Sequence, residues 1–157
     1  MIQRIQTLFL ALVAAGMIGM IALPIWQKTS IDATQSAHLT AIRLSYQQGI
    51  STQITPLWYL ALLGGVVASI AVYAIFQYKN RLLQSGLCAA NSILLTIVMG
   101  LIMYFVFGRA MAFFEPQAKG EFQIGFYALI VAMLANVLAN RAIRRDEKFI
   151  RSQERMR

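Results

Sequence analysis

Few residues of this sequence belong to the types that carry out catalysis, and none of them stands at a catalytic spacing. His38 is the only histidine and Cys88 the only cysteine, so a haem held by two histidines and a thiol oxidase with paired cysteines are both excluded. A P-loop and a zinc-spaced set of histidine and glutamate are also absent from the sequence. We therefore expect a protein that is not an enzyme, with no metal and no cofactor.

Two asparagines stand inside long apolar stretches, where an amide needs a hydrogen-bond partner. Asn91 and Asn136 are predicted to lie at a similar depth, in the cytoplasmic half of a membrane. A hydrogen bond between helices is worth about 1 kcal/mol there. We favour this role over a site for a small polar ligand, and we expect the two helices that carry these asparagines to meet near them.

A basic segment at the end of the chain is the strongest functional pattern. Residues 141–157 hold seven Lys/Arg and three Asp/Glu, directly after nineteen uncharged residues, 122–140. Such a segment anchors a chain on anionic lipid, at about 1 kcal/mol per basic residue, or it docks on a partner. The candidate docking residues are Arg141, Arg144, Arg145, Lys148, Arg151, Arg155 and Arg157.

Composition indicates the elements that must position these residues. The chain has 157 residues, of which 59% are hydrophobic and 13% charged, and its mean hydropathy is +0.62. These values are typical of a membrane protein. We predict an all-α fold in one polytopic domain, residues 1–157. Its four transmembrane helices cover residues 5–25, 57–78, 82–107 and 122–140, its outer loops 26–56 and 108–121, and its cytoplasmic tail 141–157.

The distribution of positive charge predicts the orientation. Ten of the fourteen Lys/Arg fall on the side of the membrane that holds both termini. The positive-inside rule then places both termini in the cytoplasm and the protein in the cytoplasmic (inner) membrane. The same rule explains the net charge of +8, so we rank nucleic acid below membrane lipid and other membrane proteins as partners.

Two local patterns refine this fold. Residues 40–46 alternate between two faces, 47–49 can turn the chain, and 50–55 are rich in β-branched residues, which predicts a small β-hairpin in the first outer loop. The alternative is a flexible loop. At the end of the chain, no proline or glycine interrupts residues 130–157, so we predict that the fourth helix continues through the basic tail.

Small residues at helical spacing predict where helices approach closely. In lipid, helix association depends on packing, and small side chains allow close contact. The first helix carries such a strip, the second has two adjacent glycines, and the fourth has an alanine series. The residues concerned are Ala11, Ala15, Gly19, Gly64, Gly65, Ala128, Ala132, Ala135 and Ala139.

The two ends of the chain carry a resemblance. MIQRIQTLFL at the start and LANRAIRRDEKFIRSQERMR at the end resemble a family of short four-helix membrane proteins from Bacteroidota that is known only as a domain of unknown function. That family has smaller aliphatic residues in place of Phe149 and Ile150, and often an aspartate in place of Glu154. The resemblance implies an inner-membrane location and brings no catalytic residues.

Three functional hypotheses follow. The first is a non-enzymatic accessory or structural subunit of a larger inner-membrane complex, for which a protein-secretion or translocation complex is one compatible host. The second is a small carrier or lipid-handling protein with a polar site at Asn91 and Asn136. The third is a membrane anchor whose basic tail binds the ribosome or nucleic acid. We favour the first, and we see no pattern for a small-molecule substrate.

Cysteine labelling tests the predicted orientation. In a Cys88→Ala background, a membrane-impermeant thiol reagent should label Ser36→Cys from the outside and should not reach Ser152→Cys, because these positions lie on opposite sides of the membrane. The reverse labelling pattern would show that the orientation is inverted.

Overall fold

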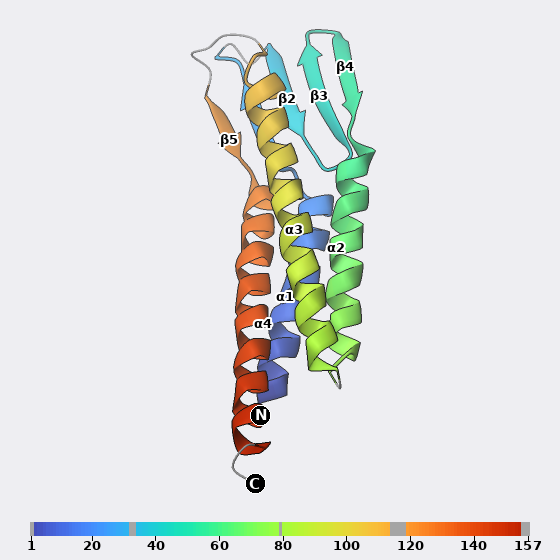
Figure 1. The fold of residues 1–157 in the computed structure, drawn as a ribbon. Helices are drawn as coiled ribbons and strands as arrows, with labels where there is room; N and C mark the ends of the chain where they lie inside the picture. The colour runs from blue at the N-terminus through green and yellow to red at the C-terminus, as the bar shows by residue number, and fades with distance from the viewer. Residues whose placement is uncertain (1, 32–33, 79, 114–118, 155–157) are drawn as a thin grey trace.

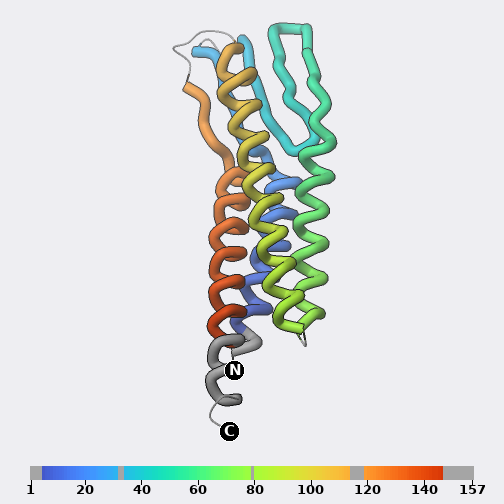
Figure 2. Tube along the Cα trace, viewed as in Figure 1, coloured from blue at the N-terminus to red at the C-terminus, as the bar shows by residue number. Residues whose placement is uncertain are grey.

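The computed structural model describes residues 2–31, 34–78, 80–113 and 119–154, with side chains described from residue 5 to residue 146 within those ranges. In this part of the chain, four α-helices form an elongated bundle, and a five-stranded antiparallel sheet stands at one end of it (Figures 1 and 2). We call this the sheet end. The opposite end, where the first and last helices bring the two termini together, is the tail end.

The four helices match the four apolar stretches of the sequence. They are α1 (Ile2–Ala22), α2 (Trp58–Phe76), α3 (Arg81–Phe105) and α4 (Ile124–Glu154). All four are long and apolar enough to cross a membrane. This confirms the prediction of four helices that can span a membrane, as in a multi-pass membrane protein.

The helix ends have local causes. The prediction placed the end of the first helix at residue 25, but α1 ends at Ala22 because Pro24 cannot donate a backbone hydrogen bond and disfavours helix at the residue before it. Asn80 caps α3 by accepting a hydrogen bond from the backbone of Leu83 at 3.2 Å. At the sheet end α3 runs into one π-helical turn, η1 (Val106–Ala110). α4 continues without a break into the basic tail.

The prediction of an all-α fold is wrong, because both loops at the sheet end contribute strands. The first loop forms β1 (Trp26–Thr29), β2 (Gln35–Leu39), β3 (Arg43–Gln48) and β4 (Ser51–Pro56), and the second forms β5 (Gly120–Phe122). The strand order is β4-β3-β2-β1-β5. The predicted hairpin exists as β3 and β4, but its turn is Gly49–Ile50, where the glycine takes a φ of +58°.

Backbone hydrogen bonds connect the sheet to the bundle without a flexible linker. Gln123 N donates to Ile25 O at 2.9 Å and Gly125 N donates to Pro24 O at 2.9 Å, which joins the end of α1 to the start of α4. On the other side, Ala61 N in α2 donates to Ala41 O in the β2–β3 turn at 3.1 Å. The sheet therefore holds a fixed position relative to the helices.

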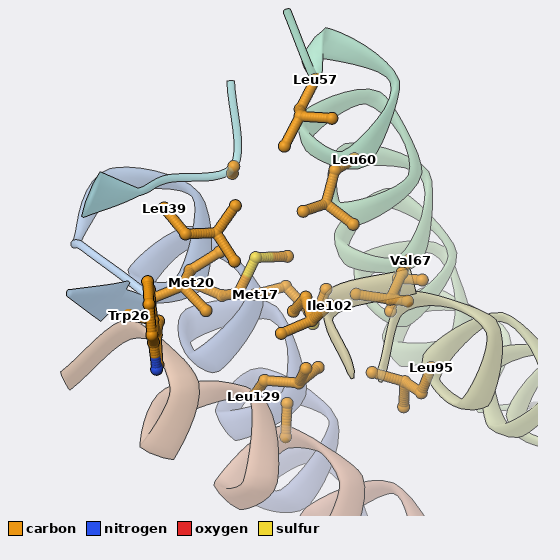
Figure 3. Close-up of a cluster of buried hydrophobic side chains, with 14 of the residues drawn as sticks. Met17, Met20, Trp26, Leu39, Leu57, Leu60, Val67, Leu95, Ile102 and Leu129 are labelled. Atoms are coloured by element: carbon orange, nitrogen blue, oxygen red, sulfur yellow. The ribbon is translucent and has the colours of Figure 1, made fainter. Parts of the chain in front are cut away.

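One apolar core runs from the bundle into the sheet. Figure 3 shows Met17 and Met20 of α1 beside Leu39 of β2, with Ile102 of α3 packed near them. Trp26 belongs to the same core and is fully buried, whereas Trp58 is 62% exposed at the start of α2. Of the two tryptophans, only Trp58 therefore has the exposure that a side chain at a membrane interface needs.

A buried lysine closes the sheet end. Lys28 in β1 is 3% exposed, and its Nζ donates to Met111 O at 3.1 Å and Phe113 O at 2.9 Å. These carbonyls follow the last turn of the α3–η1 helix, where a cation satisfies acceptors and complements the helix dipole. Beside it, the Phe113 ring stacks on Tyr46 at a centroid distance of 4.6 Å.

α1 packs more extensively against α4 than against any other element, and a glycine makes this possible. A Cβ atom built at Gly16 would lie 2.8 Å from Ala128 O and 3.0 Å from Ala132 Cβ, which is too close for a stable contact. By contrast, a Cβ at Gly65 of α2 would meet no atom within 4 Å.

This contrast gives a matched pair of substitutions. Alanine favours helix over glycine by up to about 1 kcal/mol, so Gly65→Ala should leave the thermal unfolding midpoint in detergent unchanged or raised. Gly16→Ala should lower it, because α1 and α4 must separate to admit the methyl group. Equal midpoints for the two variants would contradict the proposed role of Gly16.

Candidate functional site

Three side-chain amides line the bundle between the middle and the tail end. Gln84 and Asn91 of α3 and Asn136 of α4 are each no more than 2% exposed. Gln84 Nε2 donates to Ala74 O at 3.0 Å, and Asn91 Nδ2 donates to Val67 O at 3.3 Å. Both acceptors belong to α2, so this pair of amides fastens α3 to α2 two helical turns apart.

Asn136 fastens a different pair of helices. Its Nδ2 donates to Cys88 O at 3.0 Å and to Ser92 Oγ at 2.9 Å, and both acceptors belong to α3. The sequence prediction brought Asn91 and Asn136 to one contact between α3 and α4. In the structure Asn136 makes that contact, whereas Asn91 lies on the face of α3 that meets α2, so the two amides serve separate interfaces.

The oxygens of these three amides, unlike the nitrogens, have no hydrogen-bond partner among the described residues. Gln84 Oε1, Asn91 Oδ1 and Asn136 Oδ1 are buried and accept no hydrogen bond from the described residues. A buried acceptor without a donor costs free energy in an apolar interior. Two hollows on the described bundle surface lie elsewhere, one between α1 and α2 next to Ala14 and Val72 and one beside the start of α3 from Asn80 to Leu87. The oxygens do not line these hollows.

A second polar site lies at the tail end, and the sequence analysis missed it. Gln6 of α1 and Asp146 of α4 are each 6% exposed, and Gln6 Nε2 donates to Asp146 Oδ2. A buried carboxylate is costly unless it is hydrogen-bonded. The bond therefore holds the tail part of α4 against the first turns of α1.

A spacing in the sequence could have revealed Asp146. The buried residues of α4 include Ala132, Asn136, Ala139, Ile143 and Asp146, which follow one another at intervals of four, three, four and three. This is the period of a helix face that packs on another helix. In the charge count of the tail, Asp146 is only one of three acidic residues beside seven basic ones, and the helical period is what distinguishes it.

The described basic residues of the tail lie on the surface of the molecule. Arg141, Arg144 and Arg145 are exposed. Arg144 Nε donates to Asn140 Oδ1 at 3.2 Å, and the same oxygen accepts from Ser85 Oγ of α3 at 3.3 Å. The predicted docking residues Lys148, Arg151, Arg155 and Arg157 lie outside the described side chains.

Some of the predicted small residues lie in contacts between helices, and others are exposed on the surface of the bundle. Ala132, Ala135 and Ala139 of α4 are buried, and Ala128 packs against Gly16 and Gly19 of α1. Gly64 of α2 lies against Met20 and Ile21 of α1. The strip predicted on α1 is only partly an interface, because Ala11 and Ala15 are exposed. Gly16, one position later along the helix than Ala15, makes the closest approach.

The single histidine and cysteine take structural positions. His38 lies in β2, paired with Gln27 on one side and Ser45 on the other. Cys88 is buried within α3. Among the described residues, no group of three or more His, Cys, Asp or Glu side chains could hold a metal ion.

The family follows from comparison over the full length of the chain. Residues 2–156 match the family model "Domain of unknown function (DUF4293)". The chain belongs to this family. The match confirms the resemblance seen at the two ends of the sequence. A comparison with curated proteins finds no match. The structure thus describes a DUF4293 chain as a four-helix bundle with a sheet at one end and a helical tail at the other.

The separation of the two asparagines in this DUF4293 chain predicts additive effects. Asn136→Leu should lower the free energy of unfolding in detergent by about 1 kcal/mol, the value of one hydrogen bond between transmembrane helices, and Asn91→Leu should do the same. Because they share no partner, the double variant should lose the sum of the two. If the double variant loses markedly less unfolding free energy than the sum of the two single variants, the two amides are energetically coupled.

Proposed function

We propose that this chain is a non-catalytic subunit of a larger assembly in the cytoplasmic membrane, with the sheet outside the cell membrane and the tail in the cytoplasm. The orientation is supported by the Lys/Arg distribution, ten at the tail end against four at the sheet end. In this role the bundle joins two interaction surfaces, one on each side of the membrane.

The observation that carries this proposal is the buried hydrogen bond between Gln6 and Asp146. An anchor on fluid lipid needs positive charge but no fixed direction. Docking on a protein benefits from a helix that is already held in its bound orientation, because less entropy is lost on binding. A buried polar contact that fixes the direction of α4 beside exposed arginines therefore favours a docking helix.

The buried amides support a structural role over a carrier role. A carrier needs polar groups that face a common pathway. The amide nitrogens of Asn91 and Asn136 instead bond to backbone carbonyls on two different helix interfaces. This arrangement favours helix fastening over a shared ligand site.

Neutralising the described arginines of the tail tests the proposal. Arg141→Gln, Arg144→Gln and Arg145→Gln together should reduce the native size of the protein, measured by native electrophoresis of mildly solubilised membranes. Arg43→Gln, Arg109→Gln and Lys119→Gln together, at the sheet end, remove the same number of charges, serve as the control for loss of charge and should leave the size unchanged. Membrane insertion of both variants is checked by outside labelling of Ser36→Cys.

Two outcomes of the native electrophoresis would contradict the proposal. If the triple variant migrates at the same large size as the wild type at physiological salt, the tail arginines only anchor the chain on lipid. If the wild type itself migrates at the size of one chain in detergent, the proposal of a larger assembly is wrong.

A further inference from the structure

The sheet has two edges in the part of the chain that the structure describes, and only one of them is protected. β5 is three residues long and carries Glu121. β4 is six residues long, and the sequence from Gly49 to Pro56 contains no charged residue. Natural sheets shield their edges with short strands, charges, bulges or proline. β4 has only a proline, at its last position, so residues 51–55 form an unshielded edge.

The register shows which backbone groups of β4 are unpaired. β3 and β4 pair from Gln48 with Ser51 to Arg43 with Pro56, and the next pair, Ile42 with Leu57, is hydrogen-bonded, since Leu57 N donates to Ile42 O at 2.6 Å. Bonded and non-bonded pairs alternate in an antiparallel ladder. Ser51, Gln53 and Thr55 therefore bond to β3, and the N–H and C=O groups of Thr52 and Ile54 point outward.

The position of Pro56 agrees with this assignment. Pro56 belongs to the same set as Thr52 and Ile54, so its missing N–H would point outward and no ladder bond is lost. The side chains at this edge are exposed, and Ile54 is 55% exposed. Water can solvate these exposed groups one by one, and another extended backbone can satisfy the donors and acceptors of Thr52 and Ile54 in series.

A second copy in the same membrane does not fit this edge. β3 and β4 run nearly along the helix axes (Figure 1), so β4 strands of two copies in one membrane run in the same direction. A two-fold axis along the membrane normal would place Thr52 of each copy at the same height, whereas a parallel ladder needs a stagger of one residue. The other edge, β5, runs in the same direction as β4 and is only three residues long.

We propose that β4 is completed by an extended, uncharged segment of a different protein, which pairs antiparallel to residues 52–54 on the sheet side of the membrane. This inference rests on the proposed function as a subunit of a larger assembly. Its preferred sequence follows from the neighbours of the edge: Ile54 lies opposite Ser45, and Thr52 opposite Gln47. The partner segment should therefore place a β-branched or apolar residue opposite Ile54 and uncharged residues at its other positions along β4.

Hydrogen exchange in native membranes tests the pairing without knowledge of the partner. Membranes that contain the tagged chain at its natural level are pulsed with D₂O, quenched and captured, and the fragment that covers residues 51–56 is compared with the same fragment of the protein purified in detergent. The amides of Thr52 and Ile54 should exchange slower in membranes, on the order of tenfold or more, because only there are they bonded. The fragment from β3, which is paired on both sides, should exchange equally in the two samples.

Two substitutions at one position separate backbone from side chain. Thr52→Pro removes an outward N–H and should abolish the membrane-specific protection at Ile54. Thr52→Val keeps the N–H and the branched shape and should retain the protection. Exchange of the β3 fragment reports whether the sheet is intact in each variant; if Thr52→Pro disrupts it, the comparison of wild-type membranes with purified wild type decides alone.

Each remaining outcome overturns the inference. Equal exchange of Thr52 and Ile54 in membranes and in detergent means that the edge is free. Protection that persists in the purified chain at all concentrations means an internal partner, and protection that grows with concentration means a second copy. A large native assembly without β4 protection rejects the edge inference and leaves the proposed function standing, whereas a native size of one chain rejects both.

Discussion

The close approach of α1 and α4 is the constraint on which the rest of the structure depends. Gly16 lets the backbone of α1 lie directly against Ala128 and Ala132 of α4. β1 follows α1 after three residues, and β5 precedes α4 by one. Once the two helices touch, β1 and β5 are neighbours, and a strand from the second loop can close onto four strands from the first. The same contact brings Gln6 to Asp146 at the opposite end of the bundle.

The second constraint is the apolar surrounding of the bundle. A membrane offers no water to satisfy polar groups, so each buried amide must find a partner within the protein. Gln84, Asn91 and Asn136 all donate to backbone carbonyls of a neighbouring helix, and a carbonyl oxygen has two lone pairs and can accept such a bond in addition to the one from its own helix. These bonds act on α2, α3 and α4, which pack against one another less extensively than α1 packs on α4. The hydrogen bonds of these three amides therefore connect the helix pairs α2–α3 and α3–α4, which have the less extensive packing.

The helices could be predicted from the sequence because each contains a long uncharged run, and α1 ends earlier than predicted because Pro24 intervenes. The sheet could not be predicted as a whole. β3 and β4 are a local hairpin with a two-residue turn, but β5 has three residues and pairs with β1 more than ninety positions away. That pairing exists because α1 and α4 touch, and their contact depends on Gly16, which the Ala11–Ala15–Gly19 pattern did not single out. Asp146 was hidden for a different reason, since counting the charges of the tail obscured the helical period on which it lies.

The two proposed interaction surfaces belong to different halves of the bundle. The tail is the continuation of α4 and is held by α1 through Gln6, whereas the free edge strand β4 leads directly into α2, which α3 holds through Asn91 and Gln84. The halves meet in the apolar core around Met17 and Met20 and, between α3 and α4, at Asn136. A partner that paired with β4 on one side of the membrane and with the arginines of the tail on the other would therefore hold both halves at once. Such a partner would oppose their separation more strongly than either contact alone, because the second contact forms at the high effective concentration set by the first.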